Sequence, residues 1–79
     1  MISCKIISLK SVLDLENILS VSLPVSSGEV EILSDHAEFF GLLTPGTIIC
    51  TRSNELSKEL EISGGFCRFN NNKLVILMD

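Results

Sequence analysis

Turn-forming residues recur at short intervals along this chain, and their spacing constrains the fold more than any other feature. Such residues favour tight turns because they accept special backbone angles or bond to their own backbone. After residue 20 they leave no room between them for helices of ordinary length, so an all-β fold is expected. The turn signals are Ser26-Ser27-Gly28, Pro45-Gly46, Ser53-Asn54, Gly64-Gly65 and Asn70-Asn71-Asn72.

Short runs rich in β-branched residues lie between these turns. Alternation supports strands, since Leu60 and Ile62 would share one face while Glu59 and Glu61 share a solvated one. The last two runs are bridged by asparagines, which tolerate positive φ, and this predicts a hairpin. The expected strands are Ile2–Ser8, Ile18–Leu23, Val30–Leu33, Thr47–Thr51, Glu59–Ser63, Phe66–Phe69 and Leu74–Met78. We therefore expect a two-sheet β-sandwich of about eight to ten short strands.

The segment Ser11–Leu19 admits two interpretations. It could be a helix, with Ser11 and Asp14 forming a capping box at its start, or a strand followed by a bulge. Periodicity alone does not separate them. The apolar residues of the helical stripe would be Val12, Leu15, Ile18 and Leu19.

Size, charge and cysteine content exclude several classes of protein. The 79 residues suffice for one domain, spanning 1–79, and 46% of them are apolar, which excludes disorder. The net charge is −4 and the six basic residues are scattered, so nucleic acid is not expected as a partner. No signal peptide is expected, and the longest apolar run, Leu74–Met78, is far shorter than a membrane span of ~20 residues. Three cysteines, an odd number, indicate reduced thiols and not disulfides.

Nothing in the sequence assembles a catalytic site. His36 is the single histidine, and no metal-ligand spacing surrounds it. Gly64-Gly65 lacks the Lys-Ser/Thr pair of a phosphate-binding loop. A Cys67–His36 catalytic pair remains an alternative, because such pairs meet in space and not in sequence. We expect no cofactor, no metal and no enzymatic activity, and a chain that binds other proteins.

Two blocks of the chain resemble the epsilon subunit of the F-type ATP synthase. Gly28-Glu29-Val30-Glu31-Ile32-Leu33, His36-Ala37 and Thr44-Pro45-Gly46 match that family's G-E-L-x-I-L-P-G-H-A-P stretch and the K-P-G turn after it. Ile62-Ser63-Gly64-Gly65-Phe66 and Lys73-Leu74-Val75-Ile76-Leu77 resemble the S-G-G-F and V-T-V-L-A-D ending of its N-terminal β-sandwich. Ser34-Asp35 replaces the family's Pro-Gly, and Glu38-Phe39-Phe40 replaces Pro-Leu-Leu-like residues.

The resemblance implies a function. By this resemblance the chain would be a non-catalytic rotor subunit in the central stalk. Such a subunit binds the gamma subunit and the c-ring and couples proton flow to ATP synthesis. It implies a peripheral location at the cytoplasmic face of the bacterial inner membrane. The sequence ends where the family usually continues into a C-terminal helical hairpin, so the hairpin's inhibitory state and ATP site are expected to be lacking. An isolated chain is expected to be monomeric.

The resemblance also implies which residues face the partners. Glu29 and His36 match positions that face the polar loops of the c-ring, at one edge of the sandwich. Strand geometry alone places their loops at opposite ends of Val30–Leu33, and a purely local role for both residues is the alternative. The other functional hypotheses are a free-standing β-sandwich adaptor and a small enzyme that uses one cysteine. The predicted interface residues are Ser27, Gly28, Glu29, Asp35, His36, Glu38 and Phe39.

Overall fold

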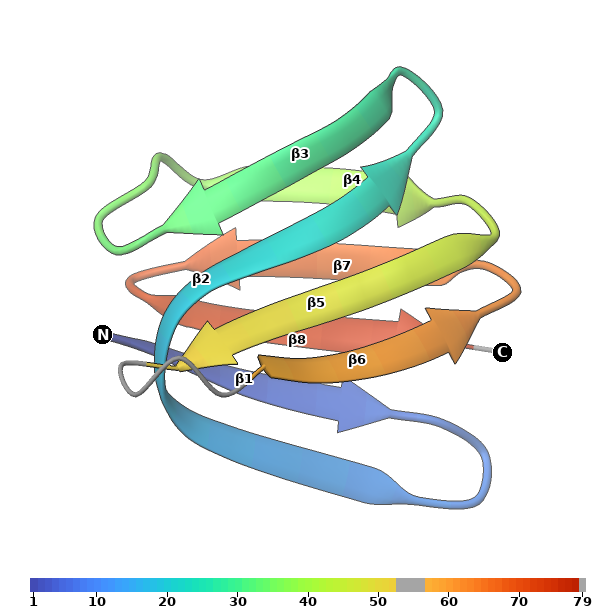
Figure 1. Cartoon of the computed structure of the whole chain (residues 1–79), viewed down its shortest axis with the longest axis horizontal. Coiled ribbons are helices and arrows are strands. Elements are labelled where there is room, and N and C mark those ends of the chain that lie inside the picture. The colour runs from blue at the N-terminus through green and yellow to red at the C-terminus, as the bar shows by residue number, and fades with distance from the viewer. Residues whose placement is uncertain (53–56, 79) are drawn as a thin grey trace.

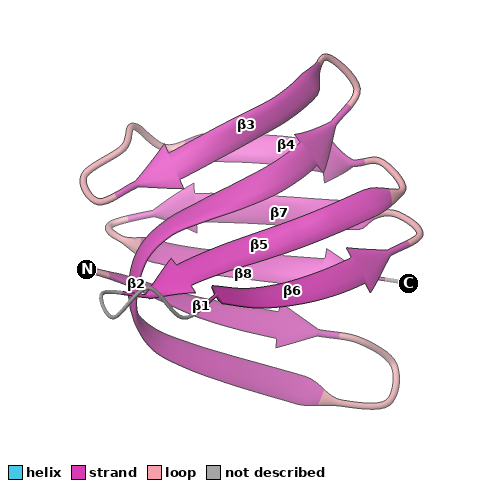
Figure 2. Ribbon diagram, viewed as in Figure 1, coloured by secondary structure: helices cyan, strands magenta, loops and turns pink. Residues whose placement is uncertain are grey.

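The computed structural model describes residues 1–52 and 57–78, and within these residues every regular element is a strand (Figure 2). The predicted turn at Ser53-Asn54 lies outside the described residues. The all-β prediction is confirmed. The strands are β1 (Ile2–Ile7), β2 (Val12–Val25), β3 (Gly28–Leu33), β4 (Phe39–Leu43), β5 (Gly46–Arg52), β6 (Ser57–Ile62), β7 (Gly65–Asn70) and β8 (Lys73–Met78).

The eight strands belong to one hydrogen-bonded sheet that folds back on itself into two layers. In Figure 1 the front layer contains β3, the second half of β2, β5 and β6, and the back layer contains β4, β7, β8 and β1. Neighbouring strands run antiparallel, except that β1 and β8 pair in parallel. The predicted β-sandwich is confirmed.

β2 is the strand that joins the two layers, and the helical interpretation of Ser11–Leu19 is wrong. Its register against β1 shifts between Leu15 and Ile18, where Asn17 has φ 60°, and its register against β5 shifts between Ile18 and Ser20. Each bulge adds one residue, so the buried residues Leu15, Ile18 and Val21 fall three apart and imitate a helical stripe. Asp14 does not cap a helix: it lies across from Lys5 of β1, with 3.9 Å between Nζ and Oδ1.

β4 is a strand that the sequence did not predict. Phe39 and Leu43 point toward the core while Phe40 and Leu42 point outward, so both faces are apolar and no alternation is visible. Gly41 lies between them because a Cβ there would come within 2.9 Å of the Phe39 ring. The other predicted strands lie within two residues of the observed bounds or, for Ile18–Leu23, inside β2.

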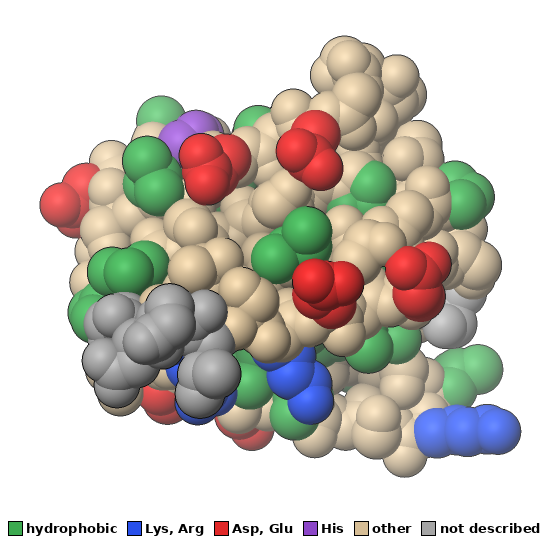
Figure 3. All heavy atoms as spheres, in the orientation of Figure 1, with side chains coloured by type: hydrophobic (Ala, Val, Ile, Leu, Met, Phe, Trp, Pro, Cys, Tyr) green, Lys and Arg blue, Asp and Glu red, His purple; other side chains and the backbone are tan. Residues whose placement is uncertain are grey.

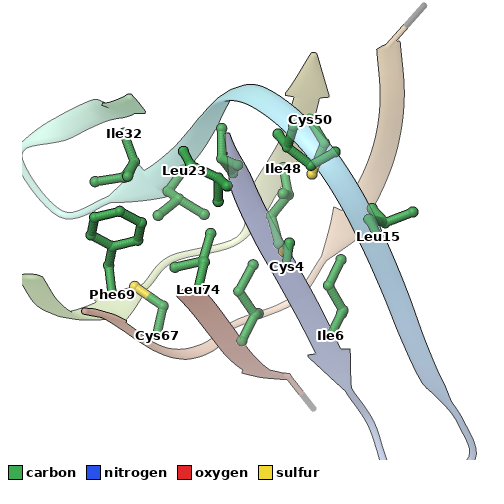
Figure 4. Packing of buried hydrophobic residues seen from close by; sticks show 14 of the residues in the cluster. Cys4, Ile6, Leu15, Leu23, Ile32, Ile48, Cys50, Cys67, Phe69 and Leu74 are labelled. Carbon is green, nitrogen blue, oxygen red and sulfur yellow. The ribbon is translucent and has the colours of Figure 1, made fainter. Parts of the chain in front are cut away.

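The core lies between the layers and contains apolar side chains from both. Phe69 of β7 is fully buried and lies close to Ile32 and Leu23 of the front layer (Figure 4). Phe66, three residues earlier on the same strand, is 40% exposed and points outward. All three cysteines are free and buried in this core, as the sequence predicted.

Candidate protein-binding surfaces

The loop between β3 and β4 carries three of the predicted interface residues, Asp35, His36 and Glu38, and a fourth, Phe39, begins β4. It begins with a tight turn in which the His36 N–H donates to the Leu33 carbonyl at 3.1 Å. Asp35, the third residue of that turn, has φ 64°, a conformation that type II turns usually assign to glycine or asparagine. The turn therefore survives the replacement of the family's Pro-Gly by Ser34-Asp35, because an aspartate also tolerates positive φ.

His36 is exposed but has several contacts within its own neighbourhood. Its ring meets those of Phe39 and Phe69 edge to face, with centroids 6.4 and 6.1 Å apart. Its Nδ1 lies 2.8 Å from the carbonyl oxygen of Ala37, which can only accept, so Nδ1 carries the proton of the neutral ring. The loop is thus anchored on the core through Phe69 while Asp35 and Glu38 remain exposed.

The other three predicted residues lie at the opposite end of β3. Ser27 lies in the turn from β2 into β3, Gly28 and Glu29 are the first two residues of β3, and all three are exposed. β3 spans about 17 Å between this turn and the His36 loop, at about 3.4 Å per residue. Within the described residues β3 pairs with β2 alone, so it is the edge strand of the front layer. Both groups therefore lie along one edge of the sandwich, but they do not converge on one site (Figure 1).

The outer surface of the back layer carries a patch that the sequence did not predict. We call it the apolar face. Phe40 and Phe66 meet there edge to face with centroids 5.4 Å apart, and Leu42 is 74% exposed. A hollow of about 270 Å³ lies between the side chains of this surface and Arg68. One sequence signal does mark it, because the uninterrupted apolar run Leu74–Met78 indicates a strand that is apolar on both sides. The apolar face consists of Phe40, Leu42, Phe66, Val75 and Leu77.

The outer surface of the front layer has the opposite character. Glu29 and Glu31 of β3 and Glu59 and Glu61 of β6 are exposed on it, as predicted for the last two. Figure 3 shows acidic side chains on both sides of a small apolar spot on this face. Thr47 donates from Oγ1 to Oε2 of Glu61 at 2.6 Å. The sandwich therefore presents an acidic face and an apolar face on its two sides.

The buried cysteines do not form an accessible nucleophile. The hydrogen bond between Cys4 and Cys50, together with burial, raises the pKa of the Cys4 thiol. The same hydrogen bond lowers the pKa of the Cys50 thiol, but Cys50 is buried and only 1% exposed. Burial raises the pKa of the Cys67 thiol, although a backbone hydrogen bond from Gly41 opposes it. A nucleophilic cysteine needs an exposed thiolate, and Cys67 is fully buried. The Cys67–His36 alternative therefore lacks an accessible thiol.

Residues 1–52 and 57–78, which the structure describes, contain no group of three or more His, Cys, Asp or Glu residues placed to hold a metal ion. They also contain no helix of the length and apolarity that would cross a membrane. A small β-sandwich with a large uncovered apolar patch is typical of domains that bind other proteins.

Comparisons with known proteins identify the family. Residues 1–79 match the family model described as ATP synthase, Delta/Epsilon chain, beta-sandwich domain. The ATP synthase epsilon chain of Pelagibacter ubique is 38% identical over 69 residues, covering 86% of this chain and 52% of the relative. That of Dichelobacter nodosus is 32% identical, covering 78% and 43% respectively. The chain therefore belongs to the ATP synthase delta/epsilon family, and it spans about half the length of these curated relatives.

A solved structure agrees on the fold. A chain of the Euglena gracilis mitochondrial ATP synthase, in a structure of OSCP, F1 and the c-ring, superposes with a TM-score of 0.90. The two share 22% identity, and the match covers 98% of this chain and 49% of the other. The β-sandwich is thus the fold of ATP synthase subunits, as the resemblance implied.

Proposed function

We propose that the chain is a non-catalytic central-stalk subunit of a proton-translocating F-type ATP synthase. In this role it binds the gamma subunit and the c-ring at the cytoplasmic face of the bacterial inner membrane. Family membership and the epsilon-chain relatives support the proposal. The observation that carries it is the apolar face, since a rotor subunit needs a stable protein contact and no nucleophile.

The two partners are assigned to different surfaces. The apolar face binds gamma, because rings such as Phe40 and Phe66 supply the area that a persistent contact requires. The edge along β3 contacts the c-ring through Glu29 at one end and the His36 loop at the other. Its side chains are polar and exposed, and such contacts determine specificity more than affinity. A rigid sandwich held on both surfaces would transmit rotation from the ring to the shaft.

Replacing Leu42 with aspartate is expected to weaken binding to gamma by at least about tenfold. Leu42 is 74% exposed, so the change should alter stability by less than about 0.5 kcal/mol while placing a charge within an apolar contact. Leu9→Asp is the matched control, because Leu9 is 99% exposed in the turn between β1 and β2. Calorimetric titration of gamma provides the measurement. Equal affinities for Leu42→Asp and Leu9→Asp would show that gamma does not use the apolar face.

Reversing the charges at the β3 edge is expected to weaken assembly with the c-ring. The variant combines Glu29→Lys with His36→Glu, and the loss should be greatest at low salt, where charge contacts are screened least. Assembly of the chain with gamma and the c-ring is measured at several salt concentrations. Unchanged affinity at low salt would contradict docking at this edge. Assembly with unrelated proteins in place of ATP synthase subunits would favour the adaptor hypothesis.

A further inference from the structure

Two segments that are far apart in the sequence are joined at one end of the sandwich. The backbone N–H of Asp35 donates to Oδ1 of Asn72 at 2.6 Å. In return, Nδ2 of Asn72 donates to Oδ1 of Asp35 at 3.1 Å. The pair thus connects the β3–β4 loop with the β7–β8 turn, 37 residues away (Figure 1).

Asn72 is itself held firmly in place. Asn71 and Asn72 have φ 52° and 61°, the positive angles that the central residues of a type I′ hairpin turn adopt. The carbonyl oxygen of Asn72 also accepts a hydrogen bond from the Ser3 N–H at 3.0 Å, which ties the turn to β1. The amide side chain therefore extends from a fixed backbone, and it offers the loop one acceptor and one donor.

The conformation of Asp35 is favoured by such a partner. At φ 64° it occupies the position where the resemblance expects a glycine. Aspartate adopts this conformation more readily than most residues, but at a cost above that of glycine, which contacts with the surrounding structure can offset. The two hydrogen bonds to Asn72 provide that compensation, and they fix the orientation of the adjacent His36.

The joined segments enclose a polar hollow of about 430 Å³. Its side chains offer two carboxylates, one imidazole and several amides. His36 borders it and rests on Phe69 of the core. The hollow is lined by Asp35, His36, Glu38, Asn70, Asn71 and Asn72.

We propose that Asn72 is a positioning residue, which holds the His36 loop in its docking conformation and extends the docking surface onto the β7–β8 turn. The partner is a polar segment of the c-ring, and this identification rests on the proposed function. Asn72 acts through Asp35 and His36. Its effect should therefore appear in binding to the c-ring and not in binding to gamma.

The test begins with Asn72→Gly in the free chain. Glycine accepts the positive φ, and Asn-Gly is the favoured pair of a type I′ turn, so the hairpin should be retained while both hydrogen bonds are lost. Amide hydrogen exchange at Asp35 should accelerate about two- to tenfold, as expected for one net hydrogen bond. Asn17→Gly is the matched control, because it makes the same change at another positive-φ asparagine. Unchanged exchange at Asp35 in Asn72→Gly would overturn the proposal.

Measuring the binding of Asn72→Gly to both partners then distinguishes a positioning role of Asn72 from a general loss of structure. Asn72→Gly should lower affinity for the c-ring about three- to tenfold and leave affinity for gamma unchanged. Equal losses for both partners, or no loss for the c-ring, would overturn the positioning role. If the wild-type chain failed to bind the c-ring, both the proposed function and the docking role would be overturned. The hydrogen-exchange result at Asp35 would still show whether Asn72 holds the loop.

An exchange of side chains provides the rescue. Asn72→Asp alone sets a second carboxylate against that of Asp35 and should weaken c-ring binding. Combining it with Asp35→Asn restores one amide and one carboxylate, now reversed, with the net charge of the wild type. The double variant should restore the protection of the residue 35 amide against hydrogen exchange to within about twofold of wild type, since one net hydrogen bond is regained. If the double variant protected this amide no better than Asn72→Asp does, the pair between positions 35 and 72 would not be what holds the loop.

Discussion

Replacing Phe69 with alanine is expected to destabilise the protein by about 3–5 kcal/mol, the usual cost of removing a buried phenylalanine ring. Phe69 is fully buried on β7, and its ring contacts that of His36 at the edge of the core. The surrounding residues come from both layers, so they cannot move together to fill the space (Figure 4). Urea unfolding of the two proteins measures the difference.

Phe66→Ala is the matched control for that measurement. Phe66 lies on the same strand but is 40% exposed on the apolar face, so its truncation should cost less than about 2 kcal/mol. The structure distinguishes the two phenylalanines, since Phe69 is fully buried and Phe66 is not. If both variants unfolded at the same urea concentration, the assignment of Phe69 to the core would be wrong.

Replacing Gly65 with alanine is expected to destabilise the protein by about 2–6 kcal/mol. A Cβ there would lie 2.3 Å from the Leu77 carbonyl oxygen and 3.0 Å from the Met78 Cα. These are backbone atoms of β8. Because β8 pairs with β7 over its whole length, its backbone cannot move away from the added Cβ without breaking that pairing. Overpacking against these atoms costs about 1–3 kcal/mol. The backbone conformation adds about 1–3 kcal/mol, because φ is 156° and alanine rarely adopts that angle. Thermal and urea unfolding both report the loss.

Gly28→Ala separates these two contributions. Gly28 also has positive φ, at 127°, but a Cβ added there would meet nothing within 4 Å. It should therefore show the conformational cost alone, about 1–3 kcal/mol. Equal losses at the two positions would mean that the close approach of β7 to β8 contributes nothing. In that case the second glycine of Ser63-Gly64-Gly65-Phe66 would be needed only for its backbone angle.

Local patterns predicted most of the strands, and the errors have identifiable physical causes. The alternation of apolar and charged residues predicted β6, and the asparagines between two apolar runs predicted the β7–β8 hairpin. β4 was missed because Phe40 and Leu42 are exposed and apolar, which removes the alternation that a half-buried strand shows. β2 was ambiguous because bulges near Asn17 shift its inward residues by one position.

The candidate surfaces were predicted only in part. Resemblance selected Glu29 and His36, and both lie exposed along the edge formed by β3. Whether they contact the c-ring stays a prediction. The apolar face was not found, because its residues come from three strands that are neighbours only after folding. The Asp35–Asn72 pair was missed for the same reason, since 37 residues separate its members.

The sequence by itself determined the all-β class, the reduced cysteines and the family. The all-β class follows from turn propensity and period-two alternation. The reduced cysteines follow from their odd number, and the family follows from the resemblance of two sequence blocks. The tertiary structure decided which phenylalanine is buried, which side of the back layer remains uncovered, and which loops meet at Asn72. Alternation shows that residues share a face, but only the packing of one layer against the other decides whether that face is buried or exposed.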